Sequence, residues 1–156
     1  MIGGMKLSSE LALVKLQHLP EAEPHRWRIW EKLTSSRINI FFLSSVCTGT
    51  LCETAFCVAA EDAYDTKVLI QPDGFPNKHI FFIPAVGALS LFPHHFSFEV
   101  LGLSLYAFGK AGLPLYGLAS SISSLTFITD YALLEKASTT MEECLVLPEG
   151  QNSVKN

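Results

Sequence analysis

The sequence predicts an α+β fold in which helices pack on antiparallel sheets. Two stretches carry this prediction, residues 36–62 and residues 111–130. Each follows a helix-like segment, alternates apolar residues, turns, and alternates again up to an acidic residue. Such recurrence indicates an internal repeat. A chain of 156 residues that is 49% hydrophobic can bury the cores of two small units, and two such units would leave no room for a separate catalytic domain.

The first half of the chain begins with a predicted strand and helix. Residues 11–19 alternate in the manner of a strand. Pro24 suits the first position of a helix, and large apolar residues recur at helical spacing up to about Ser36. A hairpin follows, with its turn near Gly49. These signals predict strand, helix, strand and strand in that order.

The remainder of the first half is less regular. Residues 63–70 can form a short helix, but residues 71–78 carry the Pro and Gly signals of a loop. The second helix of this half is therefore expected to be short or replaced by that loop. Residues 78–84 then predict a closing strand, because they are almost continuously apolar.

The second half repeats this order. Residues 86–92 predict a strand, and Ser97 is a suitable N-cap for a helix that ends near Lys110. Apolar residues lie on more than one side of that helix, so we expect more than one side to be buried. After the second hairpin, Asp130 can cap a helix to about residue 142, and residues 144–148 would form the last strand.

The order strand, helix, strand, strand, helix, strand thus occurs nearly twice, which is the ferredoxin-like βαββαβ arrangement in tandem. The expected boundaries are residues 8–85 for the first unit and residues 86–148 for the second. Residues 149–156 are expected to form a flexible tail, because they are polar and terminal.

The repeated motif resembles the ACT domain, above all the regulatory ACT domains of aspartate kinases. That family has a strand of the type Gly-Ile-Asn-Ile-x-x-Ile-Ser after its first helix and a hairpin partner ending in Val-Asp. The matching residues are Ile38, Asn39, Ile40, Leu43, Ser44 and Ser45 in the first copy, and Gly112, Leu113, Leu115, Leu118, Ser120, Ser121, Leu125, Thr126, Phe127, Ile128 and Asp130 in the second. The resemblance implies ACT-like units in both halves.

The resemblance also implies where a ligand would bind. ACT domains pair side by side and hold an amino acid at the seam, with the loop after the first strand and the start of the second strand. Those places contain the predicted ligand-binding residues, which are Arg26, Asn39, Ile40, His94, His95, Phe96 and Ser97. Asn39 matches the polar position of the family, whereas Pro114 in the second copy has lost the side chain and the backbone N–H. A small amino acid is therefore expected near Asn39 and Arg26, with the His94–His95 loop as the other possible place.

Composition excludes several classes of function. The net charge of −4 gives no clustered basic face for nucleic acid. Residues 80–98 carry no formal charge, but Pro84 and Pro93 interrupt a membrane-spanning helix. The N-terminus lacks the pattern of a secretory signal, which predicts a cytoplasmic protein with reduced cysteines. Strands that are apolar on both faces must cover the second face with the other repeat or with another chain, and we predict at least a homodimer.

No catalytic or cofactor motif is present in the sequence. It has no nucleophile elbow, phosphate-binding glycine loop or His-Glu zinc motif. Cys47 and Cys52 are expected to face each other across the first hairpin, with Cys57 on the opposite side of its strand, so three sulfurs cannot meet at one metal. Cys47 and Cys52 are then a redox pair or two small buried side chains, and we favour the second interpretation.

We therefore expect a stand-alone regulatory protein that binds a small molecule, an amino acid by resemblance, and has no catalytic centre of its own. The alternative is a structural or protein-interaction module that keeps the ACT fold without binding a ligand. A third possibility is a small enzyme of ferredoxin-like fold, because fold does not fix function.

Overall fold

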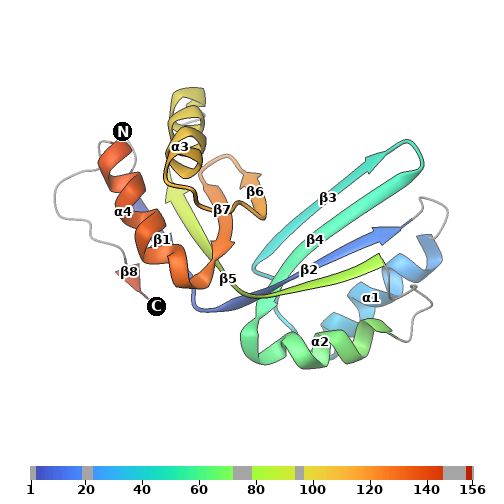
Figure 1. The fold of residues 1–156 in the computed structure, drawn as a ribbon. Helices are drawn as coiled ribbons and strands as arrows, with labels where there is room; N and C mark the ends of the chain where they lie inside the picture. Colours follow the sequence, from blue (N-terminus) through green and yellow to red (C-terminus); the bar gives the residue numbers. More distant parts are fainter. Residues whose placement is uncertain (1–2, 19–22, 72–78, 94–96, 146–153, 156) are drawn as a thin grey trace. The chain divides into compact units, whose positions relative to one another are not determined.

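A computed structural model describes residues 3–18, 23–71, 79–93, 97–145 and 154–155 of the chain. Within these residues it is a mixed α/β protein with four α-helices and an antiparallel sheet (Figure 1). The chain divides into two compact units. We call Leu11–Pro84 the continuous unit, and Met1–Glu10 together with Ala85–Asn156 the discontinuous unit. No helix in the described part of the chain is long and apolar enough to cross a membrane.

The continuous unit follows the predicted order of elements. It contains β2 (Leu11–His18), α1 (Glu23–Ser35), β3 (Phe42–Thr48), β4 (Leu51–Ala59), a 3-10 turn (Ala60–Asp62), α2 (Ala63–Ile70) and residues 80–84 of β5. The strand order is β3-β4-β2-β5. β4 is antiparallel to both β3 and β2, and the hairpin turns at Gly49 as predicted, where a φ of 57° favours glycine. The short second helix was also predicted correctly.

Both helices of the continuous unit pack on one face of its sheet. Alternate residues of the strands, such as Val14 and Phe56, form a core with Ile29 and Leu33 of α1 and with Ile70 of α2. The Trp30 ring meets the Phe56 ring edge to face, with centroids 5.4 Å apart. Period-2 alternation in the strands and helical spacing in α1 therefore bring one apolar face of each element together.

The discontinuous unit combines both ends of the chain. It contains β1 (Gly4–Leu7), β5 (Ile80–Phe92) from residue 85 onward, α3 (Phe98–Lys110), β6 (Gly117–Ser120), β7 (Leu125–Asp130), a 3-10 turn (Tyr131–Leu133), α4 (Leu134–Cys144) and β8 (Val154–Lys155). The strand order is β6-β7-β5-β1-β8, antiparallel except for the parallel pair β1 and β8.

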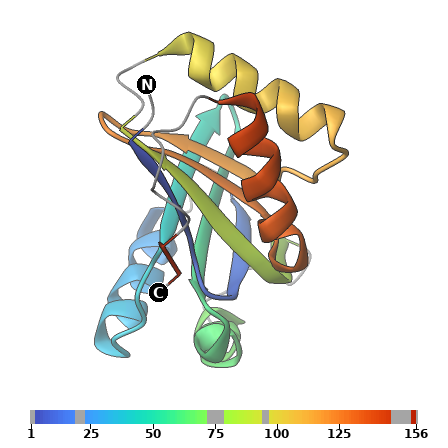
Figure 2. The ribbon, with the colours of Figure 1, turned by 90° about the vertical axis from the view of Figure 1, so that its left-hand side faces the viewer.

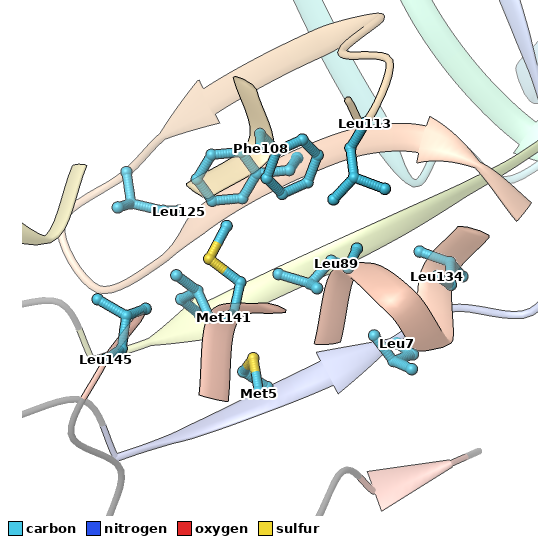
Figure 3. Close-up of a cluster of buried hydrophobic side chains, with 12 residues drawn as sticks. Met5, Leu7, Leu89, Phe108, Leu113, Leu125, Leu134, Met141 and Leu145 are labelled. Carbon is cyan, nitrogen blue, oxygen red and sulfur yellow. The ribbon is translucent and has the colours of Figure 1, made fainter. Parts of the chain in front are cut away.

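The core of the discontinuous unit lies between its sheet and the helices α3 and α4, which cover the same face (Figure 2). Met5 and Leu7 of β1 and Leu89 of β5 meet Met141 of α4 in this core (Figure 3). Phe108 of α3 stacks on Phe127 of β7, with ring centroids 5.1 Å apart. The N-terminal strand is thus an integral part of this unit.

The closing strand of the second unit was placed wrongly in the sequence analysis. Cys144 ends α4, Leu145 lies outside any strand, and residues 146–148 are outside the described residues. The strand that pairs with β5 at this position is instead β1, which is antiparallel to it and places Leu7 opposite Leu89. Local apolar patterns identify strands but not their partners, so a strand from the other end of the chain was not foreseen.

Other boundaries differ as well. The expected units began at residues 8 and 86, whereas the compact units separate after Glu10 and after Pro84. The two strands expected at 78–84 and 86–92 form one strand, β5. In the expected tail, Val154 and Lys155 form β8, whose backbone pairs with the edge of β1.

Candidate functional site

The segment that follows α1 in the continuous unit is held by a helix-ending turn. The Ile38 N–H donates to the Leu33 carbonyl oxygen at 3.0 Å, and Arg37 adopts a left-handed φ of 57°. This is the Schellman motif, which normally places glycine at the left-handed position. Ile38 is buried in the core of this unit, so the backbone direction of the residues after it is fixed.

The same turn follows α3 in the discontinuous unit. The Leu113 N–H donates to the Phe108 carbonyl oxygen at 3.0 Å, and Gly112 has a φ of 64°. Three residues after Leu113, the Tyr116 N–H donates to the Ile128 carbonyl oxygen. In the continuous unit, three residues after Ile38, the Phe41 N–H donates to the Cys57 carbonyl oxygen in the same way. Asn39 and Pro114 therefore occupy equivalent positions.

Asn39 and Ile40 lie between this turn and the start of β3, an outer strand of its unit. Asn39 is exposed, and 38% of the Ile40 surface is accessible. No described residue forms a hydrogen bond with the Asn39 amide or with the backbone N–H of either residue. A side-chain amide can donate to a carboxylate and accept from an ammonium group. Pro114 is half-buried and offers only its carbonyl oxygen.

The other predicted ligand residues are not brought together by the described part of the structure. Arg26 lies on α1, but its side chain is outside the described residues, as are His94, His95 and Phe96. Ser97 is the N-cap of α3, as predicted, and its Oγ accepts a hydrogen bond from the Val100 N–H at 3.2 Å. One lone pair of that hydroxyl is therefore used by the helix.

A polar pair that the sequence analysis did not identify lies in the discontinuous unit. The Tyr116 hydroxyl donates to Asp130 Oδ1 at 2.9 Å. This hydrogen bond, together with partial burial and the Asp130 charge, raises the pKa of Tyr116 above its ordinary value. Asp130 was expected to cap the following helix, but its side chain makes no capping hydrogen bond. The sequence signal for this pair was that Tyr116 is a tyrosine, whereas the equivalent residue of the continuous unit is Phe41.

The fold itself can be compared with solved structures. No protein-family model matches the sequence, and no curated protein matches it. The regulatory subunit of aspartate kinase from Thermus thermophilus, in its ligand-free form, superposes with a TM-score of 0.79 at 16% identity. The match covers 92% of this chain and 98% of that one. The chain has the fold of aspartate kinase regulatory regions.

Complete aspartate kinases contain the same fold. The enzyme from Clostridium acetobutylicum, described as allosteric, matches with a TM-score of 0.78 at 11% identity, over 92% of this chain and 34% of that one. E. coli aspartokinase III in complex with lysine and aspartate matches with a TM-score of 0.69 at 14% identity, over 93% of this chain and 33% of that one. The predicted resemblance to aspartate kinase regulatory domains is thereby confirmed for the fold.

Two surface pockets of this aspartate kinase-like regulatory fold are lined by residues other than Asn39 and Ile40. One of about 450 Å³ lies between the end of β1, at Ser8 and Ser9, and the 3-10 turn and start of α4, at Tyr131 and Glu135. The other, of about 460 Å³, lies along α1 beside Leu69. Neither contains a predicted ligand-binding residue.

The predicted register of the cysteines was correct, but the favoured interpretation, two small buried side chains, was wrong, and the structure has the alternative of a redox pair. Cys47 and Cys52 are directly opposite in the β3–β4 hairpin, and a disulfide joins them. Cys47 is exposed, so the pair is not two small buried side chains. Cys57 is a buried thiol on the other face of β4, and desolvation raises its pKa to about 12. Among the described residues, no three His, Cys, Asp or Glu side chains form a group that could hold a metal ion.

Proposed function

We propose that this protein is a regulatory module of the ACT type that binds a small amino acid and has no catalytic centre of its own. The observation that carries the proposal is the extent of the structural match. The chain corresponds to 98% of an aspartate kinase regulatory subunit, whereas it corresponds to about a third of complete aspartate kinases. The structural match therefore extends over a whole regulatory subunit and over only part of a complete enzyme.

We further propose that the two units are ferredoxin-like and arranged in tandem. Strand, helix, strand, strand, helix and strand follow one another in the continuous unit. In the discontinuous unit β1 replaces the last strand of that series. The sheet orders β3-β4-β2-β5 and β6-β7-β5-β1 correspond strand by strand, and the two Schellman turns support the same alignment.

The proposed ligand site of the continuous unit is formed by Arg26, Asn39 and Ile40. The exposed Asn39 amide, without a partner among the described residues, supports this choice. The corresponding group in the other unit is His94, His95, Phe96 and Ser97, beside Pro114. Because Pro114 has no N–H to offer a carboxylate, we expect the stronger binding at Asn39.

Thermal unfolding of the full chain with each common amino acid tests this function. Lysine and aspartate come first, because E. coli aspartokinase III is described in complex with both. A ligand at about 100 times its Kd should raise the Tm by roughly 5 to 10 °C. Inorganic salts at equal ionic strength serve as the control. No response to any amino acid would overturn the ligand-binding proposal.

The second candidate is a structural or protein-interaction module with the same fold and no ligand. Pro114 and the exposed apolar side chains of α3 favour it. Such a module should associate without responding to amino acids. For both candidates we propose a homodimer in the cytoplasm, although the Cys47–Cys52 disulfide is of a kind that is rare in that compartment.

A further inference from the structure

Helix α3 exposes an apolar side that nothing in the described structure covers. Ser104, Ala107 and Phe108 are buried against the core of the discontinuous unit. The residues on the opposite side, among them Phe98, Tyr106 and Gly109, are exposed. The most exposed apolar residues of α3 are Phe98 at 88%, Tyr106 at 64%, Leu103 at 40% and Leu105 at 39%. Large apolar side chains gathered on one exposed helix face are typical of an interaction surface.

The spacing of these residues fits the packing of another helix. Phe98, Leu105 and Tyr106 share one face of α3 with Gly102 and Gly109, because they follow the i, i+4, i+7, i+8, i+11 pattern. A Cβ added at either glycine would meet nothing within 4 Å. The two glycines therefore leave room for a second backbone to approach closely.

The charges of α3 indicate which helix would fit. Glu99 lies in the first turn and Lys110 in the last. Neither side chain forms an ion pair or hydrogen bond with another described residue. In an antiparallel pair of two α3 helices, Glu99 of each copy would lie beside Lys110 of the other. A parallel pair would bring like charges together, and it would also align the two helix dipoles unfavourably.

We propose that α3 is the self-association surface of this protein, pairing antiparallel with α3 of a second copy about a twofold axis. The inference rests on the homodimer that we proposed above, and it identifies the surface through which the two copies would associate. Such an interface is self-complementary, so each charge contact occurs twice. A single helix pair is small for a protein interface, so we expect association in the micromolar range.

A charge exchange tests the proposal. Sedimentation equilibrium of the full chain should show a monomer–dimer equilibrium. Glu99→Lys and Lys110→Glu should each weaken dimerisation about tenfold, because each places two like-charge contacts in the interface. The double variant Glu99→Lys, Lys110→Glu should restore the wild-type Kd to within about threefold. The matched control is Glu142→Lys, which changes an exposed charge on α4.

Disulfide trapping provides a second measurement that does not depend on charge. In a Cys144→Ser background, Glu99→Cys with Lys110→Cys should form covalent dimers on mild oxidation. The two positions are about 16 Å apart along one helix, too far for a bond within one copy. Circular dichroism checks that each variant is folded.

The proposal fails if the chain is a monomer at 100 times the expected Kd, if the dimer is insensitive to all three charge variants, or if the double variant is no better than the single ones. Amino-acid binding is measured separately by thermal unfolding of the same proteins. If the dimer forms through α3 but the protein responds to no amino acid, only the proposed ligand site is refuted. If a monomer responds to an amino acid, only the proposed interface is refuted.

Discussion

The Tyr116 hydroxyl donates a hydrogen bond to Asp130 Oδ1 at 2.9 Å, and the equivalent residues of the continuous unit, Phe41 and Ala59, cannot form it. Tyr116 precedes β6, and Asp130 is the last residue of β7. The bond therefore joins the entry of the hairpin to the start of the 3-10 turn that leads into α4. This side-chain hydrogen bond distinguishes the discontinuous unit from the otherwise similar continuous unit.

Replacing Tyr116 with phenylalanine should destabilise the protein by about 1 kcal/mol, because a hydrogen bond to a charged carboxylate is lost at a half-exposed position. The pH dependence has a definite sign. The folded-state pKa of Tyr116 lies above its ordinary value, so its contribution is complete below about pH 10 and is lost as pH rises through the folded-state pKa.

Urea unfolding at neutral and at alkaline pH checks this, with Tyr64→Phe on α2 as the control, because Tyr64 is exposed. The difference between wild type and Tyr116→Phe should shrink at alkaline pH. A difference that grows with pH would contradict the assigned hydrogen bond.

Local signals in the sequence were sufficient for elements whose pattern is continuous along the chain. Ser97 was identified as the N-cap of α3, and Cys47 was paired with Cys52, because helix caps and hairpin registers depend on neighbouring residues. β1 was missed as the closing strand, since its partner β5 is about eighty residues away. Asp62 and Asp130 seemed equivalent in the sequence but do not occupy equivalent positions in the two units. The hydrogen-bond registers of the two hairpins show that Asp130 corresponds to Ala59 of the continuous unit.

The candidate site was predicted only through the resemblance, because binding residues on separate loops leave no local periodicity. Asn39 was identified by its match to the family motif. Tyr116 and Asp130 gave no comparable signal, since the two residues are on different strands. Pairing between distant side chains depends on register, which a single sequence does not contain.

The two helix-ending turns predict opposite effects for two substitutions. Gly112→Ala should destabilise the protein by about 1 kcal/mol, because alanine is strained at a φ of 64° even though the site is open. Arg37→Gly should stabilise it by about 0.5 to 1 kcal/mol, since it removes the same strain at a φ of 57°. Arg37→Lys is the control for lost charge or length. Denaturant unfolding at fixed chain concentration measures all three, and equal effects of Arg37→Gly and Arg37→Lys would refute the strain argument.

Gly87 on β5 should not tolerate a side chain. A Cβ at this position would overlap Leu134 Cδ1, lie 2.8 Å from Leu134 Cγ and lie 3.2 Å from Tyr131 Cδ2. Gly87→Ala should therefore cost about 1 to 3 kcal/mol through overpacking. A double-mutant cycle with Leu134→Ala provides the control. The double variant should be more stable than the sum of the two single effects predicts, because the new methyl enters the space that Leu134 leaves. Additive effects would mean that the two residues do not compete for space.

The cysteines should differ sharply in reactivity. Cys144 is exposed and Cys57 is buried, and burial raises the pKa of the Cys57 thiol to about 12, so little thiolate forms there near neutral pH. A thiol reagent should label one cysteine quickly in the native protein and two after unfolding without reductant. Cys144→Ser should abolish the fast phase.

The Cys47–Cys52 disulfide makes a separate prediction. Two further thiols should appear after reduction, and removing the disulfide should lower the free energy of unfolding by about 2 kcal/mol. Four reactive thiols in unfolded, unreduced protein would show that Cys47 and Cys52 are not joined.

The last prediction concerns the ligand that the fold is proposed to bind. Asn39→Ala should weaken amino-acid binding by about 1 to 3 kcal/mol, because a charged group of the ligand would lose its hydrogen-bond partner. The matched control is Pro114→Ala at the equivalent position of the other unit, which should leave the affinity within about twofold. Since Asn39 is exposed and has no partner among the described residues, the substitution should not change the Tm of the free protein. Calorimetric titration of both variants measures the difference. Unchanged affinity in Asn39→Ala, with a loss in a His94→Ala, His95→Ala variant, would move the site to the loop before α3.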